Sequence, residues 1–146
     1  MSVKVPEFDL EGYLPYRLTV IAGQLSADLA KHYKSEFGIS MPEWRVLLNV
    51  GYTKGLSIRD IEKRVNLEKS KVSRAASKLE AKGYLTKITD DQDRRLLKLT
   101  VTKEGAKLLE RLIPFAQEFQ DKLDKRLGDK IDELHGALDL LMATEE

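Results

Sequence analysis

The chain has 146 residues, a length typical of one domain, and 42% of them are hydrophobic, which is enough for a core. Lys and Arg (25) nearly balance Asp and Glu (24), which excludes a polyelectrolyte or wholly disordered chain. The absence of cysteine excludes disulfides, thiolate metal clusters and thiol-based redox switches. With neither a long apolar run nor a secretory leader, the sequence predicts a cytoplasmic protein with no membrane segment and no cofactor.

The first part of the chain predicts two helices. Apolar residues recur at spacings of three and four from Tyr13 to Tyr33, which predicts a long helix ending near Gly38. Ser40 and Glu43 form a capping box that opens a second helix, which ends before Lys54. The apolar stripe of the first helix consists of Leu14, Leu18, Ile21, Leu25 and Leu29.

Two shorter helices and a hairpin follow. Ser57 caps a third helix of about nine residues that ends at Asn66. A fourth runs from about residue 68 to 81 and is stopped by Gly83. Residues 84–89 and 96–101 alternate as strands do. The loop between them, residues 90–95, has the sequence DDQDRR.

The last part of the chain predicts two more helices. Thr102 caps a long fifth helix with a kink at Pro114, and Gly128 with Asp129 ends it and caps a sixth. The predicted fold is therefore mainly α with a small β-hairpin. The terminal helices, about 9–38 and 103–143, are too long for the middle unit to cover, which predicts that they form a dimer interface.

The middle of the chain is basic. Residues 57–103 contain 13 Lys or Arg against seven Asp or Glu, so the neutral total conceals a basic region suited to a polyanion. On the fourth helix, apolar residues share one side, and the other side has the donors that a DNA major groove requires. A merely solvated helix face is the alternative. The predicted DNA-contacting residues are Ser70, Lys71, Ser73, Arg74, Ser77 and Lys78.

Three stretches resemble the MarR family of winged-helix transcription regulators: MPEWRVLL (41–48), SIRDIEKRVNLEKSKVSRAASKLEAKGYLTK (57–87) and DDQDRRLLKLTVTKEG (90–105). The last is similar to the family's wing, with Asp91 where Pro is usual. The resemblance implies a single MarR-type domain over 1–146, with a winged helix-turn-helix at about 40–102. It also implies a homodimer on a palindromic double-stranded DNA operator, whose binding a small ligand, often an aromatic carboxylate, relieves.

The wing supplies further candidates. Arg94 and Arg95 are expected to reach the DNA backbone or minor groove, and Asp93 either orients Arg95 or closes a turn. Four residues combine aromatic rings and cations near the cleft between the dimer and DNA-binding regions, where the resemblance implies that the ligand binds. The alternative is that these residues serve packing or dimer contacts. They are Tyr13, Tyr16, Arg17 and Arg45.

Other functions receive less support. Two sets, Asp28/His32/Glu36 and Asp132/His135/Asp139, have metal-ligand spacing but only one His each, so no metal is predicted. No nucleophile elbow or phosphate-cradling loop occurs, which argues against an enzyme. The remaining alternative is a winged-helix module that contacts proteins or coats DNA without effector control.

Overall fold

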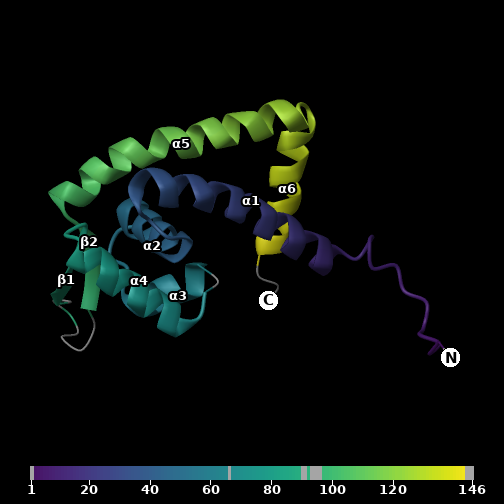
Figure 1. Cartoon of the computed structure of the whole chain (residues 1–146), viewed down its shortest axis with the longest axis horizontal. Coiled ribbons are helices and arrows are strands. Elements are labelled where there is room, and N and C mark those ends of the chain that lie inside the picture. Colours follow the sequence, from purple (N-terminus) through teal and green to yellow (C-terminus); the bar gives the residue numbers. More distant parts are fainter. Residues whose placement is uncertain (1, 66, 90–91, 93–96, 144–146) are drawn as a thin grey trace.

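The computed structural model describes residues 2–65, 67–89, 92 and 97–143. Within them are six helices and one antiparallel hairpin, so the predicted mainly α fold is confirmed. Figure 1 shows α1 and α5 side by side, a compact unit of α2, α3, α4 and the hairpin beneath one end, and α6 folding back at the other. The elements are α1 (Leu14–Phe37), α2 (Met41–Tyr52), α3 (Ile58–Val65), α4 (Lys69–Ala81), β1 (Leu85–Thr89), β2 (Leu97–Val101), α5 (Lys103–Leu127) and α6 (Lys130–Met142).

Local capping contacts fix most of the helix starts that the sequence predicts. The Ser40 hydroxyl accepts from the backbone N–H of Glu43 at 3.3 Å, and the Glu43 carboxylate accepts from the Ser40 N–H at 3.4 Å. At α3, the Asp60 N–H donates to the Ser57 hydroxyl at 3.1 Å, and the Ser57 N–H donates to the Asp60 carboxylate at 3.0 Å. Thr102 caps α5 by accepting from the N–H of Gly105 at 3.0 Å.

One detail of the predicted helix ends differs from the structure. Asp129 occupies the position before α6, but its backbone is already helical (φ −62°, ψ −16°) and its side chain makes no capping hydrogen bond. The cap prediction is therefore wrong, because a capping side chain needs extended backbone to reach the first-turn amides. Helix α5 runs through Pro114, as expected for one long fifth helix. Asn66, the predicted end of the third helix, lies outside the described residues.

The core lies under α4 and the hairpin. The inner side of α4 is buried as predicted, through Val72, Ala75, Ala76 and Leu79. Strands β1 and β2 pair from Leu85 opposite Val101 to Thr89 opposite Leu97. The N–H of Leu99 also donates to the carbonyl of Leu56 at 3.1 Å, which ties the hairpin to the chain segment before α3.

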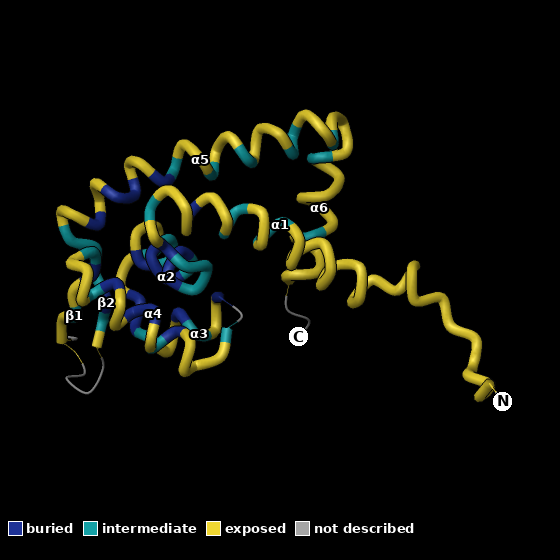
Figure 2. The backbone as a smooth tube through the Cα atoms, in the orientation of Figure 1, coloured by how far each residue is buried: buried dark blue, intermediate teal, exposed yellow. Residues whose placement is uncertain are grey.

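The outer helices bury little of their own surface. Figure 2 shows burial concentrated in the α2–α4 unit, with most of α1, the far half of α5 and α6 exposed. Tyr33 is the buried residue of α1, and no described residue of α6 is buried. The chain exposes 11404 Å², whereas a compact 16.6 kDa monomer exposes roughly 7,600 Å². No helix in the described part of the chain is long and apolar enough to cross a bilayer.

Candidate nucleic-acid interface

The outer side of α4 is polar and basic. Ser70, Lys71, Arg74, Ser77 and Lys78 are exposed, and Ser73 is half-buried. The guanidinium of Arg74 lies along its own helix, with Nε donating to the carbonyl of Ser70 at 3.4 Å. The predicted DNA-contacting residues of this helix therefore share one accessible side, opposite the buried side that packs on the core.

Part of this face is hollowed where α4 meets the start of α2. The hollow has a volume of about 210 Å³, and three cationic side chains of α4 contribute to it. Ammonium and guanidinium groups so arranged suit an anion such as a phosphate oxygen. The lining residues are Ser40, Met41, Pro42, Lys71, Arg74, Ala75 and Lys78.

Two arginines hold the helices that support α4. Arg64 of α3 donates to the side chain of Asn49 at 3.0 Å and to that of Thr53 at 3.4 Å. Arg45 of α2 donates to the carbonyl of Val65 at 3.2 Å and to the hydroxyl of Ser26 at 3.2 Å, which ties α2 to α3 and α1. Local residue patterns cannot reveal these contacts, because each joins residues at least 11 positions apart.

The wing candidates are not described by the structure. Asp93, Arg94 and Arg95 lie outside the described residues, so their DNA contacts stay predictions. The hairpin that carries them is described at both ends, from Leu85 to Thr89 and from Leu97 to Val101.

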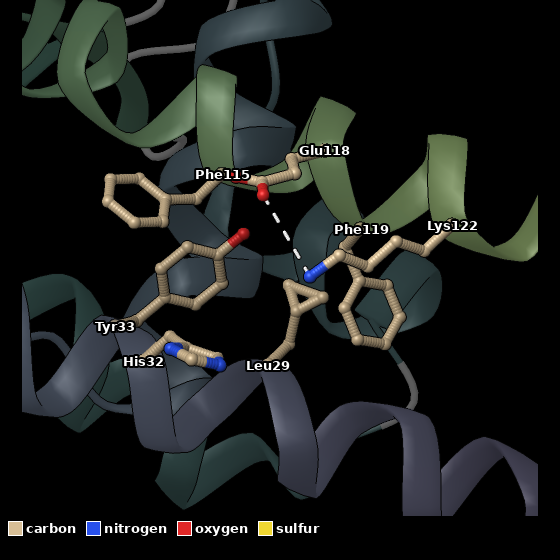
Figure 3. A pocket seen from close by; sticks show the side chains of 7 residues that line it. All are labelled: Leu29, His32, Tyr33, Phe115, Glu118, Phe119 and Lys122. Atoms are coloured by element: carbon tan, nitrogen blue, oxygen red, sulfur yellow. Dashed lines mark ion pairs between the residues drawn. The ribbon is translucent and has the colours of Figure 1, made fainter.

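A cavity of about 130 Å³ lies between α1 and α5 (Figure 3). Tyr33 is 1% exposed, and its hydroxyl points into this cavity. The hydroxyl has no hydrogen-bond partner among the described residues. Burial raises the pKa of this phenol well above its usual range. Phe115 and Phe119 contribute aromatic walls, and the Lys122 ammonium lies 3.8 Å from the Glu118 carboxylate at the rim.

A second cavity, of about 200 Å³, lies between α1, α2 and α5. Arg45 and Trp44 line it. Trp44 is buried and stacks on Tyr33 with ring centroids 4.0 Å apart. Arg45 contacts Ser26 of α1, whereas Tyr16 lies ten residues before Ser26 and is therefore about 15 Å away along the helix. The predicted ligand residues Tyr13, Tyr16 and Arg17 are exposed at the far end of α1 and do not join Arg45 in this chain.

The predicted ligand set does not include Tyr33. In the sequence this residue only ends the stretch of periodic apolar residues, and nothing there reveals that its hydroxyl lacks a partner among the described residues. No group of three or more His, Cys, Asp or Glu residues able to hold a metal ion occurs within the described ranges.

Comparisons with known proteins agree with this architecture. A family model described as the MarR family matches residues 37–96, which include α2, α3, α4 and β1. The transcriptional regulator SarZ of Staphylococcus saprophyticus is 29% identical over 110 residues, covering 73% of this chain and 75% of its own. The crystal structure of a MarR/EmrR family regulator from Acinetobacter superposes with a TM-score of 0.83 at 27% identity, covering 92% of this chain and 95% of that one.

The chain is similar to MarR-family proteins over most of its length. These relatives are transcriptional regulators, which supports DNA-binding regulation rather than catalysis for this chain. The fold alone is shared with BpsR of Bordetella bronchiseptica, at 18% identity and a TM-score of 0.77, covering 95% of this chain and 100% of that one. DNA binding by BpsR is regulated by 6-hydroxynicotinic acid.

Proposed function

We propose that this protein is a MarR-family regulator that acts in the cytoplasm as a homodimer, binds a palindromic operator and responds to a small ligand. In this proposal residues of about 40–102 bind DNA, and the helices of about 9–38 and 103–143 form the dimer. The observation that carries the DNA-binding assignment is the exposed basic side of α4, opposite a fully buried side.

The exposed surface supports the homodimer. The chain exposes about 3,800 Å² more than the roughly 7,600 Å² of a compact monomer of its mass. Apolar side chains of the terminal helices account for part of it, including Leu14, Ile21 and Leu134, which are 56%, 48% and 41% exposed. Large apolar surface of this kind is typical of an obligate interface, and a second copy is the simplest occupant.

Different residues are expected to perform different tasks on DNA. Arg74 is central on the exposed side and is expected to pair with base edges in the major groove, while its Ser and Lys neighbours hold phosphates. Arg95 is expected to enter the minor groove and Arg94 to contact the backbone. Asp93 is expected to orient Arg95, because an unpaired acid in a phosphate-facing loop would be repulsive.

The α1–α5 cavity supports the ligand response. A hydroxyl that is buried without a partner is costly, and a ligand acceptor would remove that cost. Aromatic walls with the hydroxyl of Tyr33 and the ammonium of Lys122 suit a single ring that carries an acceptor or anionic group. Tyr13, Tyr16, Arg17 and Arg45 remain secondary candidates. Oxidation of a thiol is excluded as the signal, because the chain has no cysteine.

Binding measured on a selected operator and its single-base variants tests the proposal. If each subunit neutralises three to five phosphates, log K should fall with log salt at a slope of about −5 to −9. Arg74→Ala should lose about 1 to 3 kcal/mol of discrimination between bases, whereas Arg95→Ala should weaken all operators by similar factors. Asp93→Ala binding more tightly than wild type would exclude its orienting role.

Two results would favour another function. A flat salt dependence, or unchanged base discrimination in Arg74→Ala, would remove the basis for assigning α4 to DNA reading. Binding with little dependence on sequence, and no response to any small molecule, would favour the alternative of a DNA-coating or protein-contact module.

A further inference from the structure

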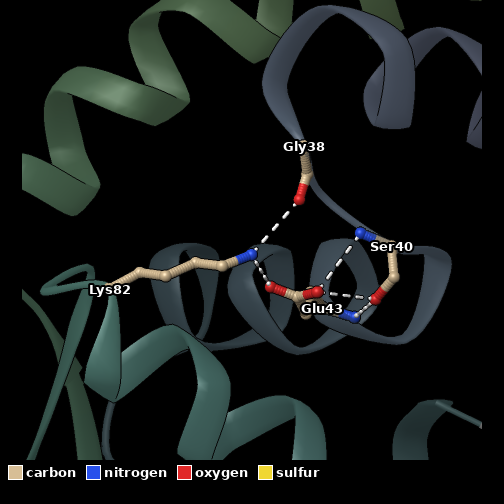
Figure 4. A network of polar contacts seen from close by, with 4 residues as sticks. All are labelled: Gly38, Ser40, Glu43 and Lys82. Carbon is tan, nitrogen blue, oxygen red and sulfur yellow. Dashed lines mark hydrogen bonds and ion pairs between the residues drawn. The ribbon is translucent and has the colours of Figure 1, made fainter.

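A buried carboxylate joins three helices at one point (Figure 4). Glu43 is 3% exposed, and its Oε1 accepts from the Ser40 hydroxyl at 2.9 Å and from the Ser40 N–H at 3.4 Å. Its Oε2 accepts from Nζ of Lys82 at 2.7 Å. The same ammonium donates to the carbonyl of Gly38 at 3.2 Å. We call this set of four residues the Glu43–Lys82 junction.

The junction lies where the dimer helices meet the DNA-reading unit. Gly38 is the C-cap of α1, Glu43 lies in the first turn of α2, and Lys82 is the C-cap of α4. Helices α1 and α4 each pack on α2. The ammonium of Lys82 adds a direct tie between the end of α1 and the end of α4, where a cation also complements the partial negative charge of the α1 terminus.

Stability alone does not explain this ion pair, in which the Glu43 side chain is buried and that of Lys82 is 40% exposed. The attraction between the charges is offset by the hydration that the carboxylate loses on burial, and apolar replacements of buried ion pairs are often equally stable. A hydrogen-bonded ion pair is directional, whereas an apolar contact is not, because each hydrogen bond forms only over a narrow range of angles and distances. Two short bonds from one ammonium, at 2.7 and 3.2 Å, restrict how α4 is oriented relative to α1.

We infer that Glu43 and Lys82 are positioning residues for DNA reading. By fixing the end of α4 to the end of α1, they set the separation of the two recognition helices in the dimer, and hence the half-site spacing that the protein accepts. This inference rests on the proposed homodimer and its operator. Neither residue needs to touch a base for this role.

A direct phosphate contact by Lys82 is the competing explanation, since its side chain is 40% exposed. Substitution of Glu43 distinguishes the positioning role from a phosphate contact, because the Glu43 side chain is only 5% exposed and is negatively charged. Glu43→Gln removes a negative charge from the DNA-binding unit and replaces the charged acceptor of Lys82 with a neutral amide oxygen, which weakens its hold on the ammonium. If Lys82 served only as a phosphate contact, this change would leave DNA binding unchanged or strengthen it.

The experiment measures the affinity of Glu43→Gln for DNA duplexes. The probe is a palindromic operator selected with the wild-type protein from a random library, together with versions whose half-sites are one or two base pairs closer or farther apart. We expect Glu43→Gln to bind the matched spacing about fivefold or more weakly, with a much smaller loss on the shifted ones. The readout is the ratio of the affinity for the matched spacing to the affinity for each shifted spacing. Partial unfolding of the sample lowers all of these affinities by the same factor and leaves the ratio unchanged.

Glu80→Gln is the matched control. Like Glu43, Glu80 pairs with a lysine: its carboxylate lies 3.7 Å from Nζ of Lys87, and this pair links α4 to β1 rather than to α1. Glu80→Gln removes the same charge and should leave the spacing ratio unchanged. If Glu43→Gln fails to fold, Lys82→Met is used in its place, and Lys82→Arg should restore the ratio.

The results separate the inference from the proposed function. A Glu43→Gln protein with the wild-type spacing ratio, and with affinity equal to or above wild type, would overturn the positioning role. A wild-type protein that binds every spacing equally, or binds as a monomer, would overturn the proposed function itself. Reduced affinity at all spacings in equal proportion would also overturn the inference, because a positioning residue must act on spacing.

Discussion

The orphan hydroxyl of Tyr33 allows a substitution whose expected effect has the opposite sign to that of most core mutations. Tyr33→Phe removes one oxygen from a residue that is 1% exposed and leaves the ring in its stack on Trp44. A buried hydroxyl without a hydrogen bond costs about 1 to 3 kcal/mol, and the void left by one oxygen offsets part of the gain. We therefore expect the ligand-free protein to become about 1 kcal/mol more stable.

For a domain of this size, 1 kcal/mol corresponds to a rise of about 2 to 4 °C in Tm. Thermal melts and urea titrations at one fixed protein concentration measure it, because the stability of a dimer depends on concentration. Tyr52→Phe is the control, since Tyr52 is 62% exposed and the cost of a buried hydroxyl does not apply to it, so no change is expected. A lower Tm for Tyr33→Phe would show that the hydroxyl has a partner in the native assembly and would refute the reasoning.

Four further results are expected. Leu134→Asp should convert the proposed dimer into a 16.6 kDa species by mass measurement, because it puts a charge in an apolar seam, whereas Leu140→Asp, about 120° away around α6, should not. Gly105→Ala should destabilise the protein by about 1 to 3 kcal/mol in urea, since an added Cβ would overlap a backbone oxygen. Gly136→Ala has open space and should stabilise α6 by about 1 kcal/mol. Hydrogen bonds lower the pKa of Asp60 in the folded state, so stability should fall as pH drops below about 4, and less steeply in Asp60→Asn.

The features that sequence predicted well are those decided within one helical turn. Ser40, Ser57 and Thr102 each bond to a backbone group three residues ahead, so the capping rules locate them without knowledge of the fold. The buried and exposed sides of α4 follow from its helical period. Asp129 shows the limit of such rules, because residue type favours a cap but the backbone angle decides whether one forms.

Contacts between distant parts of the chain could not be predicted in this way. The Glu43 carboxylate was expected only as part of a cap, and its bond to Lys82 joins residues 39 positions apart. That bond exists because α4 packs on α2, a packing set by the summed apolar surface of both helices. Arg45 was interpreted as a ligand residue for the same reason, since its type suggests anion binding while its position directs it to Val65 and Ser26.

Helix α2 connects the sites that DNA reading and a ligand response require. Trp44 stacks on Tyr33, whose hydroxyl points into the α1–α5 cavity, and the preceding residue, Glu43, is bonded to Lys82 at the end of α4. Close-packed aromatic side chains do not deform continuously, so a ligand that displaces Tyr33 must also displace Trp44 or break the stack. Movement of Trp44 acts on the same turn of α2 that orients the junction. In the proposed homodimer, a ligand held between the terminal helices would therefore need no contact with α4 to change the spacing that the two copies of α4 accept.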